Sequence, residues 1–529
     1  MSGPAVLPRA LVSPWVLIVA ILLGFFWQLG SVPLYDLDEG AFTEATREMM
    51  ASGNYITPHK DGEPRYDKPV LIYWFQAASV RALGLNEFAL RLPSALAASV
   101  WVLALWGFVR ERLDQDAATV AALVMVLTLE VSMIAKAATA DAVLNLFLTL
   151  AFLDIYRWYL EPRRGTLLRV YLWLGLGFLT KGPVAIFFPL LVSFLFFLSF
   201  RALRDWWRAV FFPLGWLVFL AVAVPWYVAI YIDNGSGFFE SFFLKHNLGR
   251  FGGTVHGHKG FVGYYFVVLP LILLPFTGWF LRLISVGRGF WADPLDRFLL
   301  LWFAAVFVFF SFSGTKLPHY VLYGAVPLFI LMAKYRAQLT NRWLAYVPPT
   351  AFFLLLLVLP ELLDLAATQT SRVHQLAMFE EGRGLLDGTY RLMVVVGLTM
   401  ILALALWRGL NVWQGLMLVG FIQVLVVYGA LVPRVFEVMQ QPVKEAALVA
   451  RSLDIPTVIY RTNMPSFSVY REAITPERDP LPGELVFLRL DKLEILAERL
   501  PHLEQELLFK RGQVALVWVS DRLSAPDPG

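Results

Sequence analysis

Cysteine is absent from the 529 residues, and charged residues are scarce. The lack of cysteine excludes disulfides, thiolate metal sites and cysteine nucleophiles. Charged residues make up only 16% of the chain, whereas soluble domains contain about 25%. The formal net charge is +4, which is small and dispersed, so we expect no nucleic-acid partner.

Long apolar runs account for most of the sequence. The chain is 58% hydrophobic and has a mean hydropathy of +0.63. Apolar runs of about 20 residues are typical of membrane-spanning helices, and the sequence predicts about thirteen of them. The predicted spans are 11–31, 92–109, 117–134, 141–160, 167–180, 184–200, 209–231, 261–281, 298–313, 319–333, 343–363, 391–407 and 411–431.

Two apolar stretches need a separate interpretation. The first run, 11–31, is too long for a signal peptide and has no small-residue cleavage site, so we expect a retained span. The stretch 70–84 is short and contains Arg81. It is therefore predicted to be a juxtamembrane helix and not a span.

Lysine and arginine positions predict which loops share a side of the membrane. Alternate loops are short and basic, as cytoplasmic loops are. They contain Arg110 and Arg112, Arg163, Arg164 and Arg169, Arg201, Arg204 and Arg208, Arg282, Arg288 and Arg297, and Lys334, Arg336 and Arg342. The segments 33–90, 135–140, 181–183, 232–260, 314–318 and 364–389, and the C-terminus, are then expected outside.

A second domain is predicted at 432–529, where hydrophobicity falls and charges return. Periodicity favours a helix at 444–453, strands at 457–460, 485–490 and 514–519, and helices at 491–500 and 502–510. This small α/β domain contains no glycine-rich phosphate loop and no metal motif. We interpret it as a packing or acceptor-docking domain.

The outer loops contain most of the unusual chemistry. Tyr35-Asp36-Leu37-Asp38-Glu39 follows the first span directly. Ionisable residues at a membrane boundary indicate a functional site. Lysines, arginines and histidines accompany these acids in the outer loops, although the charge bias disfavours cations on that face. Together they suggest a site for an anionic group such as a lipid phosphate.

These residues carry a resemblance to a known family. The chain resembles the bacterial GT-C glycosyltransferases that use polyprenyl-phosphate sugars, in the ArnT-like branch (aminoarabinose lipid A transferase), with protein O-mannosyltransferases as more distant relatives. The matching segments, in family order, are Asp38-Glu39 with Arg47-Glu48-Met49-Met50-Ala51-Ser52-Gly53, Tyr66-Asp67-Lys68-Pro69, Thr180-Lys181-Gly182, Pro225-Trp226, His246 with Arg250-Phe251, His258-Lys259, and Lys316-Leu317-Pro318 with Tyr320.

The resemblance implies a fold, a reaction and a location. The fold would be a polytopic α-helical membrane protein of GT-C type, with periplasmic juxtamembrane helices within 36–90 and a small periplasmic C-terminal domain. The enzyme would lie in the bacterial inner membrane. At the periplasmic face it would move a sugar from undecaprenyl phosphate to lipid A or to another envelope glycolipid, polysaccharide or protein. The donor is already activated, so no nucleotide cofactor is expected.

The resemblance also assigns residues. Asp38 matches the family's catalytic aspartate, Asp141 matches a second aspartate of the cavity, and Glu39 is grouped with them as catalytic. Asp38 would orient or deprotonate the acceptor. The alternative for Asp38 and Asp141 is a structural one, since each precedes a predicted helix and could cap it.

Cationic and aromatic residues would hold the carrier phosphate and the sugar. The resemblance assigns this role to Lys68, Arg250, Lys181, Lys316, Tyr320 and His258. Cations in a water-poor site stabilise a departing phosphate; the alternative is that the lysines extend to the membrane interface.

Asp67 and His246 match positions that bind a divalent metal ion in similar proteins. A carboxylate and an imidazole are suitable zinc ligands, although two ligands do not complete a site.

One departure from the family motif concerns the substrate. Similar sequences usually read Asp-Glu-Pro-Arg-Tyr, whereas this chain has Ala41 and Phe42 in place of the arginine and tyrosine, and Asp67 where glutamate is common. The identity of the sugar and acceptor therefore stays open. Two other classes also stay open: a transporter or flippase for a lipid-linked sugar, and a noncatalytic assembly protein. The first would need charges deep within its spans.

Overall fold

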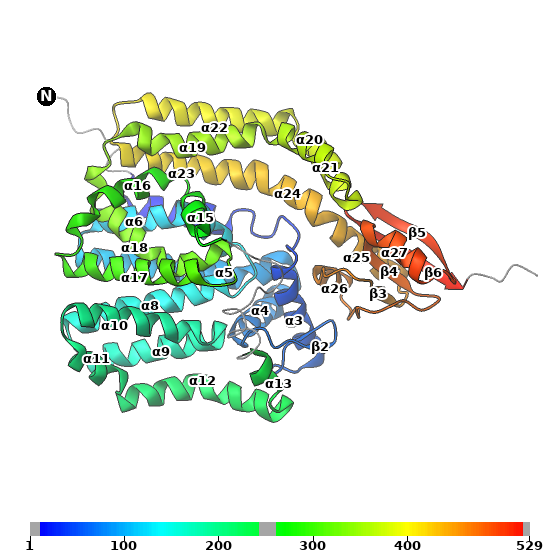
Figure 1. Cartoon of the computed structure of the whole chain (residues 1–529), viewed down its shortest axis with the longest axis horizontal. Coiled ribbons are helices and arrows are strands. Elements are labelled where there is room, and N and C mark those ends of the chain that lie inside the picture. The colour runs from blue at the N-terminus through cyan, green and yellow to red at the C-terminus, as the bar shows by residue number, and fades with distance from the viewer. Residues whose placement is uncertain (1–10, 243–260, 522–529) are drawn as a thin grey trace, which may run out of the picture.

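The protein is a bundle of long helices joined to a small C-terminal sheet (Figure 1). A computed structural model of the chain describes residues 11–242 and 261–521. The sheet and its helices lie at one end of the bundle, and α3 and α4 lie between the two (Figure 1).

The first half of the bundle is formed by consecutive helices and one small hairpin. These are α2 (Pro14–Ile21), the π-helical η1 (Leu22–Phe26), α3 (Asp38–Ser52), β1 (His59–Lys60), β2 (Glu63–Pro64), α4 (Leu71–Leu83), α5 (Glu87–Arg112), α6 (Gln115–Leu127), α7 (Leu129–Ala135), α8 (Asp141–Leu160), α9 (Arg164–Lys181), α10 (Val184–Ser199), α11 (Leu203–Val210), α12 (Pro213–Asn234) and α13 (Gly237–Phe239). Helix α8 packs against both α5 and α9, and α12 packs against α9.

The second half adds helices on the other flank of α5 and α6. These are α15 (Tyr264–Ile272), α16 (Thr277–Val286), η3 (Gly287–Gly289), α17 (Pro294–Phe312), η4 (Pro318–Gly324), α18 (Val326–Lys334), η5 (Arg336–Gln338), α19 (Arg342–Leu357), α20 (Leu359–Gln369), α21 (Val373–Leu385), α22 (Gly388–Leu406), α23 (Val412–Val426), η6 (Val427–Leu431) and α24 (Val432–Met439).

The membrane class of the chain follows from helix length and composition. Within the described residues, six helices are long and apolar enough to cross a bilayer, and three bent pairs raise that number to nine. The longest of them runs from Val412 to Met439, so the domain boundary expected at residue 432 falls inside a helix. These lengths establish a polytopic helical membrane protein, whereas the thirteen-span arrangement stays a prediction.

Side-chain caps fix where several of these helices begin. Asn86, Asp114, Asp293 and Asn341 each accept a backbone N–H of the first turn of the helix that follows. Such caps satisfy amides that have no partner within the helix. They explain why the polar residues between the apolar runs coincide with the helix starts.

The stretch 70–84 forms α4, a short helix that packs on α3 and α5. The predicted helix is therefore confirmed. Helix α3 ends at Gly53, which adopts a left-handed conformation (φ 72°) that suits glycine. Helices α3 and α4 lie at the end of the bundle that faces the sheet (Figure 1).

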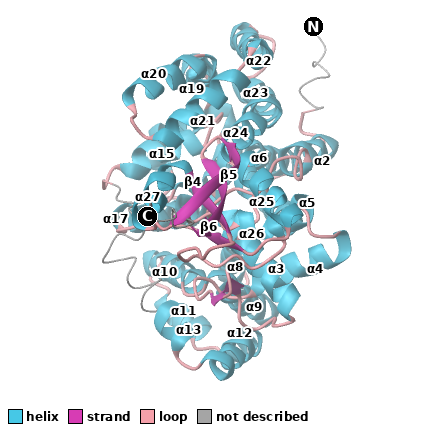
Figure 2. Ribbon diagram, turned by 90° about the vertical axis from the view of Figure 1, so that its right-hand side faces the viewer, coloured by secondary structure: helices cyan, strands magenta, loops and turns pink. Residues whose placement is uncertain are grey.

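The C-terminal unit is a four-stranded mixed sheet with the order β3-β4-β6-β5. Figure 2 looks at this end of the bundle and shows the sheet in front of the helices. Its elements are α25 (Gln441–Leu453), β3 (Thr457–Ile459), α26 (Ser466–Arg471), β4 (Leu485–Arg489), η7 (Leu490–Lys492), α27 (Leu493–Arg499), β5 (Leu503–Arg511) and β6 (Val514–Asp521). Strand β3 pairs in parallel with β4, and β6 pairs antiparallel with β4 and β5.

The helix predicted at 502–510 is wrong, because this segment is β5. Its glutamate, glutamine and leucine content favours a helix. A turn at Gly512 (φ 51°) instead folds the segment back onto β6, where Leu503 pairs with Asp521 and Arg511 with Val514. Pairing with a buried strand therefore overrides the local preference.

Arg511 ties the sheet to the bundle. Its guanidinium donates to Glu381 of α21 at 2.8 Å, to Glu437 of α24 at 2.7 Å and to Glu445 of α25 at 2.6 Å. These carboxylates raise the pKa of Arg511 further above its usual value, although burial opposes them. One strand end is thus joined to three helices.

Replacing Arg511 should loosen this junction. Arg511→Gln leaves three carboxylates without their shared cation, and we expect a loss of about 1–2 kcal/mol in the free energy of unfolding, because the group is partly solvated. Limited proteolysis between α24 and β3, together with thermal unfolding in detergent, measures it. Arg451→Gln, which removes an exposed pair with Glu472, is the matched control and should be near neutral.

Candidate active site

One cavity of about 690 Å³ lies where the predicted outer loops meet. It is lined by segments from both ends of the chain, namely Asp36, Leu37, Asp38, Ala41, Phe42, Lys60, Glu63, Pro64, Arg65, Tyr66, Asp67, Lys68, Thr139, Asp141, Lys181, Ser241, Thr315, Leu317, His319, Tyr320 and Asn463. Most of these residues are polar or charged, in contrast to the apolar bundle around them.

The cavity gathers six residues that the sequence singled out from five separate segments. They are Asp38, Asp67, Lys68, Asp141, Lys181 and Tyr320. Six of the predicted site residues therefore converge on one cavity.

Asp38 opens α3 and faces this cavity. It is the first helical residue, and Leu37 before it occupies the cap position without a side-chain bond. Asp38 is exposed and makes no hydrogen bond or ion pair within residues 11–242 and 261–521. The capping alternative therefore does not account for it.

Asp141 is the centre of a buried polar group. Its Oδ1 atom lies 2.5 Å from Lys181 Nζ and 3.7 Å from His319 Nε2, and it accepts a 3.2 Å bond from the Tyr323 hydroxyl. Asp141 also begins a helix without capping it through its side chain. The carboxylate is thus positioned by three polar side chains.

Lys181 contacts both Asp141 and Tyr323 in this cluster. At the end of α9, its ammonium also donates to the Tyr323 hydroxyl at 2.9 Å and faces the rings of Tyr320 and Tyr323 at 5.5 and 5.7 Å. A lysine held in this way positions Asp141. Because its ammonium is already paired with Asp141, Lys181 is less available to bind a substrate phosphate than an unpaired cation would be.

Lys68 lies beside α4, with its ammonium 3.1 Å from the carbonyl oxygen of Asp67. The carboxylate of Asp67 faces Arg65, with 3.5 Å between Oδ2 and Nη2. The expected metal ligand His246, like the expected phosphate ligands Arg250 and His258, lies outside the described residues. Of the two expected metal ligands, only Asp67 lies within the described residues, so the metal site stays a prediction.

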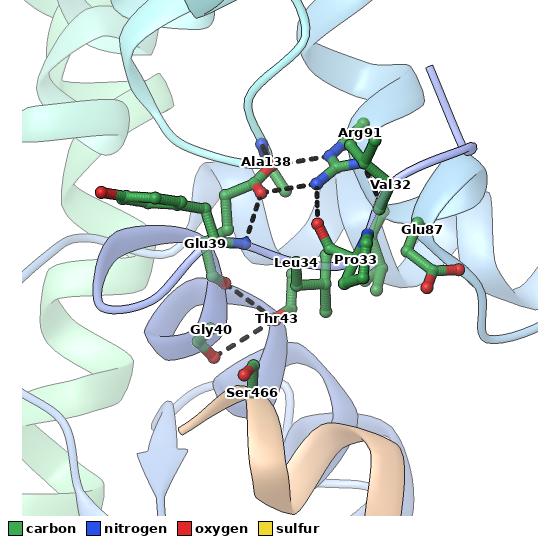
Figure 3. A network of polar contacts seen from close by, with 12 residues as sticks. Val32, Pro33, Leu34, Glu39, Gly40, Thr43, Glu87, Arg91, Ala138 and Ser466 are labelled. Carbon is green, nitrogen blue, oxygen red and sulfur yellow. Dashed lines mark hydrogen bonds and ion pairs between the residues drawn. The ribbon is translucent and has the colours of Figure 1, made fainter. Parts of the chain in front are cut away.

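Glu39 does not belong to the cavity, and its predicted catalytic role is replaced by a structural one. Figure 3 shows its carboxylate turned into the protein against Arg91. The Oε2 and Oε1 atoms lie 2.7 and 2.8 Å from Arg91 Nη2 and Nε, and they also accept the amides of Tyr35 and Ala138. Successive residues of a helix point about 100° apart, so Asp38 and Glu39 face different surroundings.

Lys316 is also absent from the cavity lining, contrary to its predicted role. Its ammonium donates to the carbonyl oxygens of Ser311 at 2.7 Å, Ser313 at 2.8 Å and Phe310 at 3.3 Å. Lysine at a helix C-terminus satisfies carbonyls that have no amide partner. Lys316 therefore caps α17, while its neighbours Thr315 and Leu317 line the cavity.

Several cavity residues were not among the predicted site residues. His319 of η4 lines the cavity and contacts Asp141, and Tyr323 of the same element bonds to Asp141 without lining the cavity. Arg65 precedes the Asp67-Lys68 pair, and Asn463 comes from the C-terminal unit. Among these residues, the sequence indicated a site role only for His319, because it precedes the predicted site residue Tyr320. A contact between residues about 400 positions apart has no signature in a single sequence.

Asp36 connects the cavity to the C-terminal unit. Its Oδ1 accepts the backbone N–H of Ser466 at 3.0 Å, and its Oδ2 accepts the Ser466 hydroxyl. Burial raises the pKa of Asp36 to about 7, although both bonds from Ser466 oppose the shift. Gly40 lies so close to this contact that an added Cβ atom would be 2.0 Å from Asp36 Oδ1 and 2.7 Å from Ser466 N.

Comparison with known proteins gives a consistent picture. Residues 67–228 match the family described as dolichyl-phosphate-mannose-protein mannosyltransferase. The undecaprenyl phosphate-alpha-4-amino-4-deoxy-L-arabinose arabinosyl transferase of Aeromonas hydrophila is 30% identical over 351 residues, covering 63% of each chain. The enzyme of the same name from Shewanella sediminis is 32% identical over 334 residues, covering 61% of this chain and 59% of its own.

An uncharacterised protein of Aquifex aeolicus is 30% identical over 334 residues, which cover 62% of this chain and 73% of its own length. The crystal structure of ArnT from Cupriavidus metallidurans bound to undecaprenyl phosphate superimposes with a TM-score of 0.80 at 21% identity, covering 99% of this chain and 100% of that one. This likeness shows a shared fold. The match to the arabinosyl transferases spans somewhat less than two thirds of their length, about 63% for the Aeromonas enzyme.

Removal of charge from the neighbouring carboxylates Asp38 and Glu39 should have different effects on the free energy of unfolding. Glu39→Gln leaves Arg91 buried without its partner, and we expect a loss of about 3 kcal/mol in the free energy of unfolding. Asp38→Asn should leave stability within about 0.5 kcal/mol of the wild type, because its side chain is exposed. Thermal unfolding in one detergent measures both, and equal stability of the two variants would contradict the assignment.

The contact of Asp36 predicts a pH dependence. With its pKa raised to about 7, folded Asp36 keeps its proton where the unfolded chain has released it. The free energy of unfolding should therefore fall as the pH rises from about 4 to about 7. Asp36→Asn should flatten this slope in melting curves, while Asp479→Asn, an exposed control, should retain it. A slope unchanged in Asp36→Asn would overturn the prediction.

Proposed function

We propose that this chain, which is similar to the ArnT arabinosyl transferases, transfers a sugar from a polyprenyl phosphate carrier to an acceptor at the periplasmic face of the inner membrane. The observation that carries the proposal is the joint lining of one polar cavity by Asp38, Asp141 and Lys68. An exposed carboxylate, a positioned carboxylate and a cation are the groups that such a transfer requires.

The reaction replaces one bond of the anomeric carbon by another. The bond to the carrier phosphate breaks, and the carrier leaves as a phosphate with the electron pair. The acceptor oxygen forms the new bond, and a hydroxyl acceptor gives its proton to the carboxylate of Asp38. If the acceptor is itself a phosphate, this proton is already absent, and Asp38 serves to orient the acceptor.

Lys68 and Asp141 complete this assignment. Charge gathers on the departing phosphate, and a fixed cation such as Lys68 stabilises it most in a site poor in water. Asp141, held by Lys181, His319 and Tyr323, presents a fixed acceptor for sugar hydroxyls. The metal site expected at Asp67 and His246 stays a proposal, and no step depends on it.

The location rests on the distribution of charge. We propose thirteen spans, with the cavity and the C-terminal domain in the periplasm, because the loops opposite the cavity are the short basic ones. The proposed donor is an undecaprenyl phosphate sugar. The proposed acceptor is lipid A or another envelope glycolipid, polysaccharide or protein. Ala41 and Phe42 change the cavity next to Asp38, so aminoarabinose is not assigned as the sugar.

A labelled donor tests the activity directly. Purified protein is incubated with a radiolabelled polyprenyl-phosphate sugar and a membrane extract, and the label should appear in a new covalent product. Label that only crosses the vesicle membrane would instead indicate a flippase. A deletion strain, analysed by mass spectrometry of lipid A, surface polysaccharide and secreted proteins, then identifies the acceptor.

Single substitutions separate chemistry from donor binding. Asp38→Asn should lower the turnover by about 10²–10⁴-fold, which is the usual contribution of a general base. Lys68→Ala should chiefly raise the KM for the donor. Asp479→Asn and Lys510→Ala change exposed residues of the C-terminal unit and serve as matched controls. Unchanged turnover in folded Asp38→Asn would rule out its role.

A further inference from the structure

Arg65 is a cavity-lining cation whose hydrogen bonds are incomplete. Its side chain is only 9% exposed. The Nε and Nη1 atoms are buried and have no hydrogen-bond partner in the described part of the chain. The remaining nitrogen, Nη2, lies 3.5 Å from Asp67 Oδ2, which is longer than a hydrogen bond of normal geometry.

A buried guanidinium with unpaired donors lowers the stability of the folded protein. Each buried donor without a partner costs about 1–3 kcal/mol, and more when the group is charged. Native proteins pair nearly all such groups, so an exception indicates a missing water, ion or ligand. The buried donors of Arg65 can therefore serve a hydrogen-bond acceptor that enters the cavity.

The surroundings hold the guanidinium in place. Its Cζ atom lies 4.8 Å from the centre of the Phe42 ring, an arrangement that orients a guanidinium without using its donors. The Arg65 amide donates to Pro58 at 2.8 Å, which closes the β1–β2 hairpin. The residue is thus fixed by its backbone and by the face of one ring.

Arg65 lies apart from the cations around Asp141. Lys68 donates to the carbonyl oxygen of Asp67, whereas Arg65 faces the Asp67 carboxylate, and Lys181 pairs with Asp141. On the other side of the hairpin, Lys60 reaches Asn463 of the C-terminal unit at 3.4 Å. The cations of the cavity lining thus have different immediate partners, and Lys60 and Arg65 come from the β1–β2 hairpin and the residue after it.

We propose that Arg65 binds an oxyanion, a phosphate or carboxylate group of a substrate, at a subsite separate from that of Lys68. Arginine is the side chain best suited to such groups, because its planar fork offers several donors in fixed directions. The acceptor is the expected source of this group, and the carrier phosphate is the other source. The inference deepens the proposed function and rests on it for the identity of the substrates.

Binding to the full-length protein in nanodiscs tests the subsite without requiring turnover. The probes are undecaprenyl phosphate, diphosphorylated lipid A and the same lipid A stripped of phosphate, each titrated against wild type, Arg65→Gln and Lys68→Gln. We expect Arg65→Gln to weaken binding of phosphorylated lipid A at least tenfold and to leave the dephosphorylated form unchanged. Lys68→Gln should instead weaken binding of undecaprenyl phosphate.

The possible outcomes are distinct. Loss of undecaprenyl phosphate binding in Arg65→Gln supports the subsite, with the carrier as the source of the oxyanion. Unchanged affinity for both phosphorylated probes overturns it and leaves Arg65 as a partner of Asp67. Arg65→Lys should recover part of the affinity, and its folding serves as a check on Arg65→Gln. A wild type that binds these probes but transfers no label would refute the proposed function alone.

Discussion

The buried ion pair of Glu39 and Arg91 is the constraint on which the site depends. Arg91 lies on α5 and also donates to the carbonyl oxygens of Leu29, Val32 and Pro33, so one guanidinium joins the exit of the first helix to the start of α3. Glu39 in turn holds the amide of Ala138, three residues before Asp141. Two carboxylates of the cavity, Asp38 and Asp141, are therefore positioned by Glu39, which does not line it.

The C-terminal unit completes the cavity as well as covering it. Asn463 lines the wall, and Ser466 bonds to Asp36, two residues before Asp38. Arg511 fastens the far edge of the same unit to the bundle. Because the C-terminal unit and the first loop are joined by the contact of Ser466 with Asp36, a displacement of the sheet would be transmitted to the start of α3. An interpretation as a simple packing domain leaves out this contribution to the site.

The sequence predicts the helices well because long apolar runs have few alternatives in a membrane protein. The same reasoning brought Asp38, Lys68 and Asp141 together, since loops on one face of a bundle must meet. It failed for Lys316, because a cation at a helix end has the same local sequence whether it caps carbonyls or faces a substrate. It failed at 502–510 because strand pairing is decided by a distant partner.

The position of cations around Asp38 differs from the family motif. The usual motif has arginine and tyrosine where this chain has Ala41 and Phe42. Alanine leaves the space over this turn of α3 open, and the Phe42 ring lies against the guanidinium of Arg65, which comes from the hairpin. A cation from outside α3, Arg65, thus lies against the Phe42 ring of this helix. The cavity wall next to Asp38 is therefore formed by Ala41 and Phe42 of α3 and by Arg65, which follows the hairpin.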